Sequence, residues 1–188
     1  MTVRHLAAWM AAALIAIANS GAASAQEVLL SEDQAIREIF PEAARTTRES
    51  RPLDAATRRG LEQRLGRRID DDTIHATLVY GAGGEFRGYA VVTEEIGKYR
   101  PITFMVGVTP AFTVRDVAVM VYRESRGGEV RRRRFLDQYR GKKASDPIDV
   151  NRDIISISGA TLSVRSLNAG VKRVLAEVAA VYGNAREK

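Results

Sequence analysis

Apolar residues recur with a helical period at both ends of the region after residue 26, and with a period of two between them. Ser31 and Gln34 have the spacing of a capping box, and Pro41 ends the apolar stripe that follows, which predicts a short helix. A polar connection comes next. A second helix is expected over residues 55–65, with Gly66 as its stop signal.

The middle of the chain alternates apolar residues with others, which is typical of strands packed on a core. The alternation begins at residue 73, and its runs are separated by turns that contain glycine or proline. Residues 73–123 are therefore expected to form an antiparallel meander. Residues 124–152 are polar and less regular, with a short helix expected near residues 131–140.

The last element has the clearest helical pattern, because its apolar positions all fall on one helix face. They are Leu167, Val171, Val174, Leu175, Val178 and Tyr182. An extended segment, residues 153–157, is expected to lead into this helix, and Gly183 and Asn184 are expected to end it. Together the patterns predict the α+β class, with a twisted antiparallel sheet and packed helices.

Residues 1–25 have the composition of a cleavable signal peptide. Arg4 precedes a short apolar run, and small residues ending in Ala23-Ser24-Ala25 form an A-x-A cleavage site. The run is shorter than the roughly 20 residues of a membrane-spanning helix. We therefore expect export to the periplasm with cleavage before Gln26; an uncleaved anchor, and hence membrane association, is the alternative.

The chain is basic, with 29 Lys and Arg against 23 Asp and Glu and a formal net charge of +6. In an exported protein this charge favours phospholipid headgroups, acidic proteins or phosphorylated ligands over nucleic acid. The run Arg131–Arg134 is a candidate docking site for an acidic redox partner or anionic headgroups. A solvated face is the alternative.

Two residue types restrict the chemistry. The chain has no cysteine, and His75 is its only histidine after residue 25. These counts exclude a cysteine nucleophile, a disulfide framework and a metal site built on several histidines. No metal site and no catalytic residue are predicted.

The segment Ser158-Gly159-Ala160-Thr161 comes directly before the last helix. A helix N-terminus carries unpaired amides and a partial positive charge, and phosphates bind there. Gly159 and Ala160 would let a ligand approach the backbone, and Ser158 and Thr161 supply hydroxyls. The alternative is a plain turn with Thr161 or Ser163 as the N-cap.

Residues 158–163 resemble the S/T-G-A-T motif of the FMN-binding domain family. This family includes the flavin subunits of Rnf and Na⁺-translocating NADH:quinone reductase complexes, and exported relatives. In the family the motif threonine is esterified to the phosphate of FMN by a flavin transferase that uses FAD as donor. Thr161 matches this threonine, so the resemblance implies covalently attached FMN.

Other segments resemble the family in the same order. Residues 124–128 are similar to its E-T-P-G segment near the flavin, and residues 135–142 to its aromatic-x-x-Q-F-x-G-K segment. The resemblance implies an FMN-binding domain over residues 73–183, preceded by an N-terminal helical segment over residues 26–72. The residues it implies for cofactor binding are Ser158, Gly159, Ala160, Thr161, Leu162, Ser163, Glu124, Gly127 and Lys142.

The match departs from the family pattern at Ser125 and Arg126, which replace the usual Thr and Pro, and at Ile155. The transferase recognition pattern usually has an acidic residue six positions before the threonine, and this chain has Ile155 there. Asp153 is the nearest acid. FMN held without a covalent bond by the same turn is therefore the alternative.

The resemblance implies a periplasmic flavoprotein that acts in electron transfer. Its expected partners are the flavin transferase, for maturation, and a membrane or periplasmic redox partner. No acid–base constellation is visible in the sequence, which favours electron relay over self-contained turnover. A periplasmic flavin-dependent reductase, and a flavin-free interaction module that retains the fold, are the alternatives.

Overall fold

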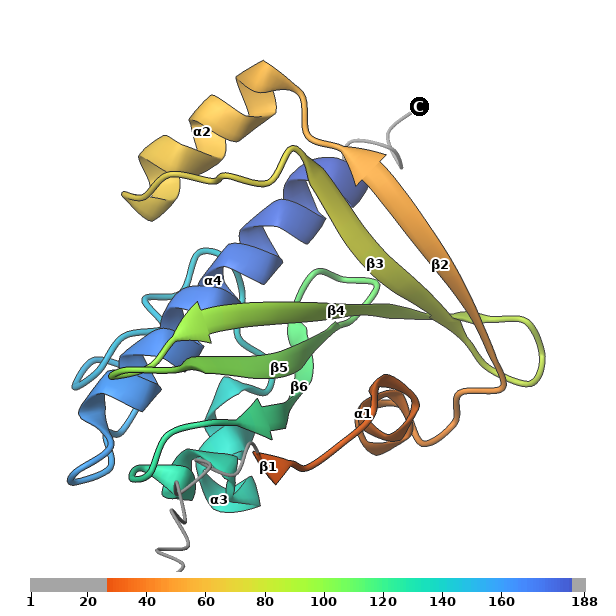
Figure 1. Ribbon diagram of the computed structural model, residues 1–188. Helices are drawn as coiled ribbons and strands as arrows, with labels where there is room; N and C mark the ends of the chain where they lie inside the picture. The colour runs from red at the N-terminus through yellow and green to blue at the C-terminus, as the bar shows by residue number, and fades with distance from the viewer. Residues whose placement is uncertain (1–26, 184–188) are drawn as a thin grey trace, which may run out of the picture.

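A computed structural model describes residues 27–183, which form one antiparallel sheet with helices packed on both faces (Figure 1). The sheet has six strands in the order β1-β6-β5-β4-β3-β2. The strands are β1 (Glu27–Val28), β2 (Arg45–Pro52), β3 (Thr73–Tyr80), β4 (Phe86–Ile96), β5 (Pro101–Val108) and β6 (Val114–Tyr122). The helices are α1 (Glu32–Ile39), α2 (Ala55–Leu65), α3 (Arg133–Leu136) and α4 (Thr161–Gly183), with short 3₁₀ turns at Gly128–Arg131 and Asp137–Tyr139. The predicted α+β class is confirmed, whereas the predicted signal peptide, residues 1–25, lies outside the described residues.

Strands β3 to β6 form the predicted meander, and their alternation gives the sheet two apolar faces. On β5 and β6, Val106 and Val117 belong to the core under α4, whereas Met105 and Ala118 belong to the core under α1. Successive side chains of a strand point to opposite faces, so α4 and α1 cover opposite sides of the sheet. This is the two-sided arrangement that Figure 1 shows.

Helix α4 is the largest contributor to the core. All six residues of its predicted apolar face are buried. Each such aliphatic side chain contributes roughly 1.5–3 kcal/mol when it is removed from water. Helix α2 packs on the far end of α4 through Leu61 and Ala176. Near the start of α4, the Ser166 hydroxyl donates to the Ile96 carbonyl at the end of β4, which places this end of the helix beside the turn between β4 and β5.

The two short N-terminal helices have the ends that the sequence predicted. At α1, the Ser31 hydroxyl accepts from the Gln34 amide at 3.3 Å, and the Ser31 amide donates to the Gln34 side chain at 2.8 Å. Helix α2 ends at Gly66, which has the left-handed φ of 65°. No helix within residues 27–183 is long and apolar enough to cross a membrane.

The prediction of an irregular polar connection between these helices is wrong, because residues 45–52 form strand β2. This strand pairs with β3 in unbroken antiparallel register, from Arg45 opposite Tyr80 to Pro52 opposite Thr73. Most of its side chains are exposed, so it lacks the alternation that marks a half-buried strand. The sheet therefore extends into residues 26–72, the segment predicted to be helical, and β1 and β2 both come from it.

The extended segment expected over residues 153–157 is also absent as a strand. Residues 151–153 form a turn, and Ile154 makes only an isolated bridge to Val150. The Asp153 carboxylate accepts from the amides of Ile148 at 3.1 Å and Asp149 at 2.9 Å, which curls the chain. The segment before α4 is therefore an ordered loop.

Candidate functional site

A cavity of about 400 Å³ lies where three segments meet: the start of α4, the turn between β4 and β5, and the loop after β6. Its lining residues are Lys98, Tyr99, Glu124, Ser125, Arg126, Gly159, Ala160, Thr161, Leu162 and Ser163. Six of the nine predicted cofactor-binding residues are among them. The sheet topology thus brings together residues that are more than 60 positions apart in the chain.

The turn before α4 has the geometry that its glycine permits. The Ala160 amide donates to the Ile157 carbonyl at 3.0 Å, and Gly159 between them has a φ of 80°. A type II turn needs positive φ at that position, which favours glycine. Ala160 then accepts the first helical hydrogen bond, from the Val164 amide at 2.9 Å.

Ala160 therefore occupies the N-cap position of α4, and its methyl group cannot cap a helix. Thr161 and Ser163 lie inside the first helical turn, so the plain turn capped by either hydroxyl is not what the structure forms. The first-turn amides have no partner within the helix. They lie at the cavity wall, since residues 161–163 line it.

A buried hydroxyl pair ties the start of α4 to the loop after β6. The Tyr122 hydroxyl donates to the Arg126 carbonyl at 2.6 Å and lies 3.1 Å from the Ser163 hydroxyl. Burial raises the pKa of Tyr122 above its ordinary value, so the phenol keeps its proton for this bond. Ser163 is then the donor to the Tyr122 oxygen. The Ser163 hydroxyl is thus engaged in the bond to Tyr122, although Ser163 is one of the residues that line the cavity.

Gly127 does not line the cavity and lies behind the lining residues Ala160 and Ser163. It has a φ of 82°, and a Cβ there would meet the Tyr122 hydroxyl at 3.0 Å, the Ser163 hydroxyl at 3.1 Å and the Ala160 Cβ at 3.3 Å. Glycine is needed here because the loop after β6 and the start of α4 approach so closely. Its role in the site is to permit this contact.

Glu124 shapes the cavity by holding the turn opposite α4. Its carboxylate accepts from the amides of Tyr99 at 2.6 Å and Arg100 at 2.9 Å. Burial opposes ionisation, but the amide hydrogen bonds and the charge of Lys98 outweigh it and lower the pKa of Glu124. Glu124 thus remains an anion that positions the turn, in place of the salt bridge to an arginine that a strand-end acid often forms.

The cavity has a basic and partly apolar lining. Lys98 and Arg126 contribute positive charge, and Glu124, the one acid in the lining, is engaged with backbone amides. Tyr99 is 72% exposed and Leu162 is 45% exposed, so the lining presents an aromatic and an aliphatic side chain to solvent. A phosphate near the helix start and an aromatic body along the exposed side chains would suit this lining.

The remaining predicted site residues lie elsewhere. Ser158 is exposed in the turn and does not line the cavity. Lys142 does not line it either, because its ammonium pairs with Asp153 at 2.9 Å. This ion pair places Lys142 against the loop that precedes the Gly159 turn. Within residues 27–183, no group of His, Asp or Glu is arranged to hold a metal ion.

Four lining residues are not among the nine that the resemblance implies for cofactor binding: Lys98, Tyr99, Ser125 and Arg126. The approach of Lys98 and Tyr99 to α4 depends on Glu124, 25 residues away from Tyr99. No local pattern reports such a contact.

Fold and cavity together define a small α+β domain in which a cavity lies at a helix N-terminus backed by an antiparallel sheet. Residues 97–176 match the family model of the FMN-binding domain. A crystal structure of Shewanella oneidensis NqrC has a similar fold, with a TM-score of 0.58, 15% identity, and coverage of 86% of this chain and 92% of that one. Comparison with curated protein sequences gives no match.

Proposed function

We propose that this protein is an electron-transfer flavoprotein that holds FMN in the cavity at the start of α4, with the FMN phosphate esterified to Thr161. The observation that carries the proposal is the placement of Thr161 at the first turn of α4, in the cavity wall, within the region that matches the FMN-binding domain model. Bound FMN would supply one- and two-electron redox chemistry, and the protein supplies placement and electrostatics.

The residues present fit an FMN phosphate. The first-turn amides of α4 and the positive charges of Lys98 and Arg126 favour an anion at this end of the cavity. The exposed hydroxyl of Thr161 is accessible for attachment. The side chain of Ala160 is small. The space at Gly159 is open, because no atom beyond its chain neighbours lies within 4 Å of the point where a Cβ would be.

Placement in the periplasm, and maturation by a flavin transferase that uses FAD, belong to the same proposal. A covalent anchor would retain the flavin where FMN is not resupplied. The redox partner would be a membrane or periplasmic protein. The signal-like residues 1–25 and the basic charge support this placement.

The test is expression of the full chain together with a flavin transferase, followed by intact mass measurement and absorption spectroscopy. The expected product is yellow protein whose mass increases by FMN less one water. Thr161→Ala should lose the added mass and keep the fold. Thr161→Ser, which retains an acceptor hydroxyl, and Ser158→Ala, which removes a neighbouring one, should both remain labelled.

The two alternatives have their own signatures. Yellow protein that releases all its flavin on denaturation would replace the covalent attachment by non-covalent FMN. Colourless protein of unchanged mass would refute flavin binding and leave an interaction module. Labelled Thr161→Ala protein would assign the attachment to another residue.

A further inference from the structure

A second cavity, also of about 400 Å³, lies between α3 and residues 155–157. Its lining residues are Glu129, Arg132, Arg134, Phe135, Gln138, Ile155, Ser156 and Ile157. It shares no lining residue with the FMN cavity. Ser156 and Gly159 are three residues apart, so the two walls are connected by no more than about 11 Å of chain.

The floor of this second cavity is apolar and held in place. Phe135 is almost fully buried, whereas Ile155 is 77% exposed, the most exposed large apolar residue in the described part of the chain. The Ile155 amide donates to the Gln138 side chain at 2.7 Å, and the Gln138 amide group donates back to the Ile155 carbonyl at 3.5 Å. The exposed side chain therefore projects from a fixed backbone.

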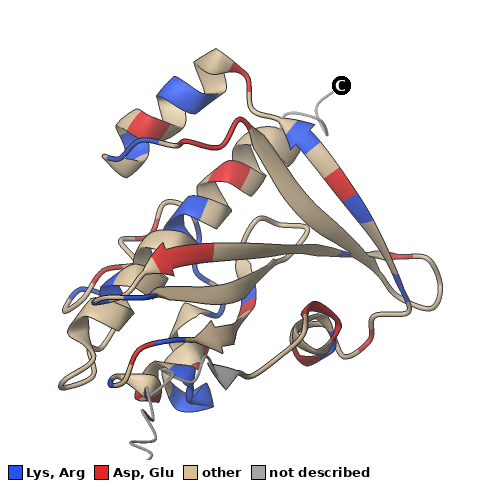
Figure 2. Cartoon of the chain, viewed as in Figure 1, with Lys and Arg blue, Asp and Glu red and all other residues tan. Residues whose placement is uncertain are grey.

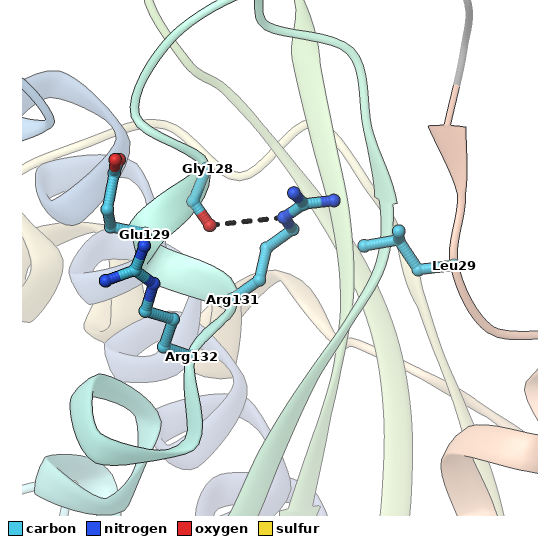
Figure 3. A pocket seen from close by; sticks show the side chains of 5 residues that line it. All are labelled: Leu29, Gly128, Glu129, Arg131 and Arg132. Atoms are coloured by element: carbon cyan, nitrogen blue, oxygen red, sulfur yellow. Dashed lines mark hydrogen bonds between the residues drawn. The ribbon is translucent and has the colours of Figure 1, made fainter.

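The four arginines of residues 131–134 have different surroundings: two make contacts within the fold, and two line this cavity. Arg133 pairs with the buried Asp116 at 2.8 Å, and the Arg131 side chain donates to the Gly128 carbonyl at 3.1 Å. Figure 3 shows Arg131 directed toward Leu29 and Arg132 directed the other way. Figure 2 shows the basic ribbon of α3.

Arg132 and Arg134 are exposed and line the second cavity. Within residues 27–183 neither side chain makes an ion pair or hydrogen bond. Glu129 is the one acid in the lining, so the cavity keeps a net positive charge. Two free guanidinium groups beside an apolar floor are suited to a carboxylate, which arginine binds with paired hydrogen bonds.

Ser156 is a half-buried residue of the lining, and its hydroxyl oxygen is enclosed by surrounding atoms with no hydrogen-bond partner within the described residues. Recognition of a ligand in this cavity therefore rests on the two arginines and the apolar floor.

We propose that the second cavity binds a small organic carboxylate with a planar apolar body, such as an aromatic acid. Arg132 and Arg134 take the carboxylate, and the body lies on Phe135, Ile155 and Ile157. Ile155 is decisive in this site, because an acid at position 155 would neutralise the arginines and remove part of the apolar wall. The inference does not depend on FMN attachment at Thr161.

The test is calorimetric titration of the full purified protein with trans-cinnamate, cinnamamide and acetate. Cinnamate should bind, and cinnamamide and acetate should bind at least about tenfold more weakly, since each lacks one half of the recognition. Arg132→Gln and Arg134→Gln should each weaken cinnamate binding several-fold, and Ile155→Asp should abolish it. Arg165→Gln, on the exposed face of α4, should leave it unchanged.

Several results would overturn the proposal: no binding of cinnamate, equal binding of acetate, or full binding by Ile155→Asp. The titration is repeated on Thr161→Ala and on flavin-loaded protein. Binding lost on flavin loading would make the cavity part of the flavin site and overturn the proposal. Binding by a protein that never takes up FMN would refute the proposed function and leave this site standing.

Discussion

The Glu124 carboxylate, just after β6, accepts from the Tyr99 amide in the turn between β4 and β5 at 2.6 Å. The second amide, that of Arg100, makes the carboxylate a two-point clamp on the turn that forms one side of the cavity at the start of α4.

Glu124→Gln is expected to weaken this clamp and lower the free energy of unfolding by about 1 kcal/mol, a small value because the carboxylate is largely solvated. The pKa of Glu124 is lowered, so its stabilising contribution is full above the ordinary glutamate pKa of about 4.3 and is lost as pH falls through the lowered pKa. Urea unfolding at several pH values measures both effects. Glu129→Gln is the control and should change neither. Equal stability of Glu124→Gln and the natural protein at pH 7 would contradict the clamp.

Gly127→Ala should destabilise the protein more than Gly84→Ala. Both glycines have nearly the same positive φ, 82° and 81°, but only Gly127 has neighbours where a Cβ would lie. Gly84→Ala should cost about 1 kcal/mol for the backbone conformation alone. Gly127→Ala should cost at least about 1 kcal/mol more and reduce flavin uptake, because it pushes α4 from the loop after β6. Chemical denaturation and the flavin-to-protein absorbance ratio test this. Equal losses of unfolding free energy in the two variants would show that α4 and the loop after β6 move apart without a penalty.

Asp153→Asn should disturb the loop before the Gly159 turn more than Lys142→Gln does. The Asp153 carboxylate accepts from Lys142 and from two backbone amides, and these hydrogen bonds lower its pKa although burial opposes them. We expect a loss of about 1–2 kcal/mol for Asp153→Asn and under about 1 kcal/mol for Lys142→Gln, which leaves both amide bonds intact. Thermal unfolding ranks the two variants. If Lys142→Gln lost more FMN binding than Asp153→Asn, the result would instead support a direct contact between Lys142 and the cofactor.

Glu177→Gln is expected to stabilise the protein at neutral pH. Glu177 is buried on α4, and burial raises its pKa against the opposing effect of Arg173, which also contacts Glu95 at 3.3 Å. A carboxyl group with a raised pKa in the folded state loses stability as pH rises from its unfolded pKa through the raised value. The variant should therefore match the natural protein near pH 4 and exceed it by about 1 kcal/mol at pH 7. Urea unfolding at the two pH values decides, and a less stable variant at pH 7 would show that the contact with Arg173 outweighs the cost of burial.

The parts of the fold that the sequence predicted are those with local signals. The capping box at Ser31, the left-handed stop at Gly66, the meander and the apolar face of α4 all follow from short-range patterns. Strand β2 was missed because its pairing with β3 is made by the backbone, whereas its side chains are polar on both faces.

The same division applies to the site. The turn at Gly159 and the place of Thr161 at the helix start could be predicted, since both depend on neighbouring residues. The contribution of Tyr99 could not, because a hydrogen bond to Glu124 brings it to the cavity. Lys142 was assigned to the cofactor by resemblance, and its partner Asp153 became visible only in three dimensions.

The β2 edge of the sheet has a consequence for how copies of this protein meet. At this edge, β2 presents three arginines and a glutamate and ends at Pro52, which has no amide to donate. A second molecule that approached this edge with its own β2 would meet like charges. Copies of the protein can therefore be concentrated without joining through β2 into larger sheets.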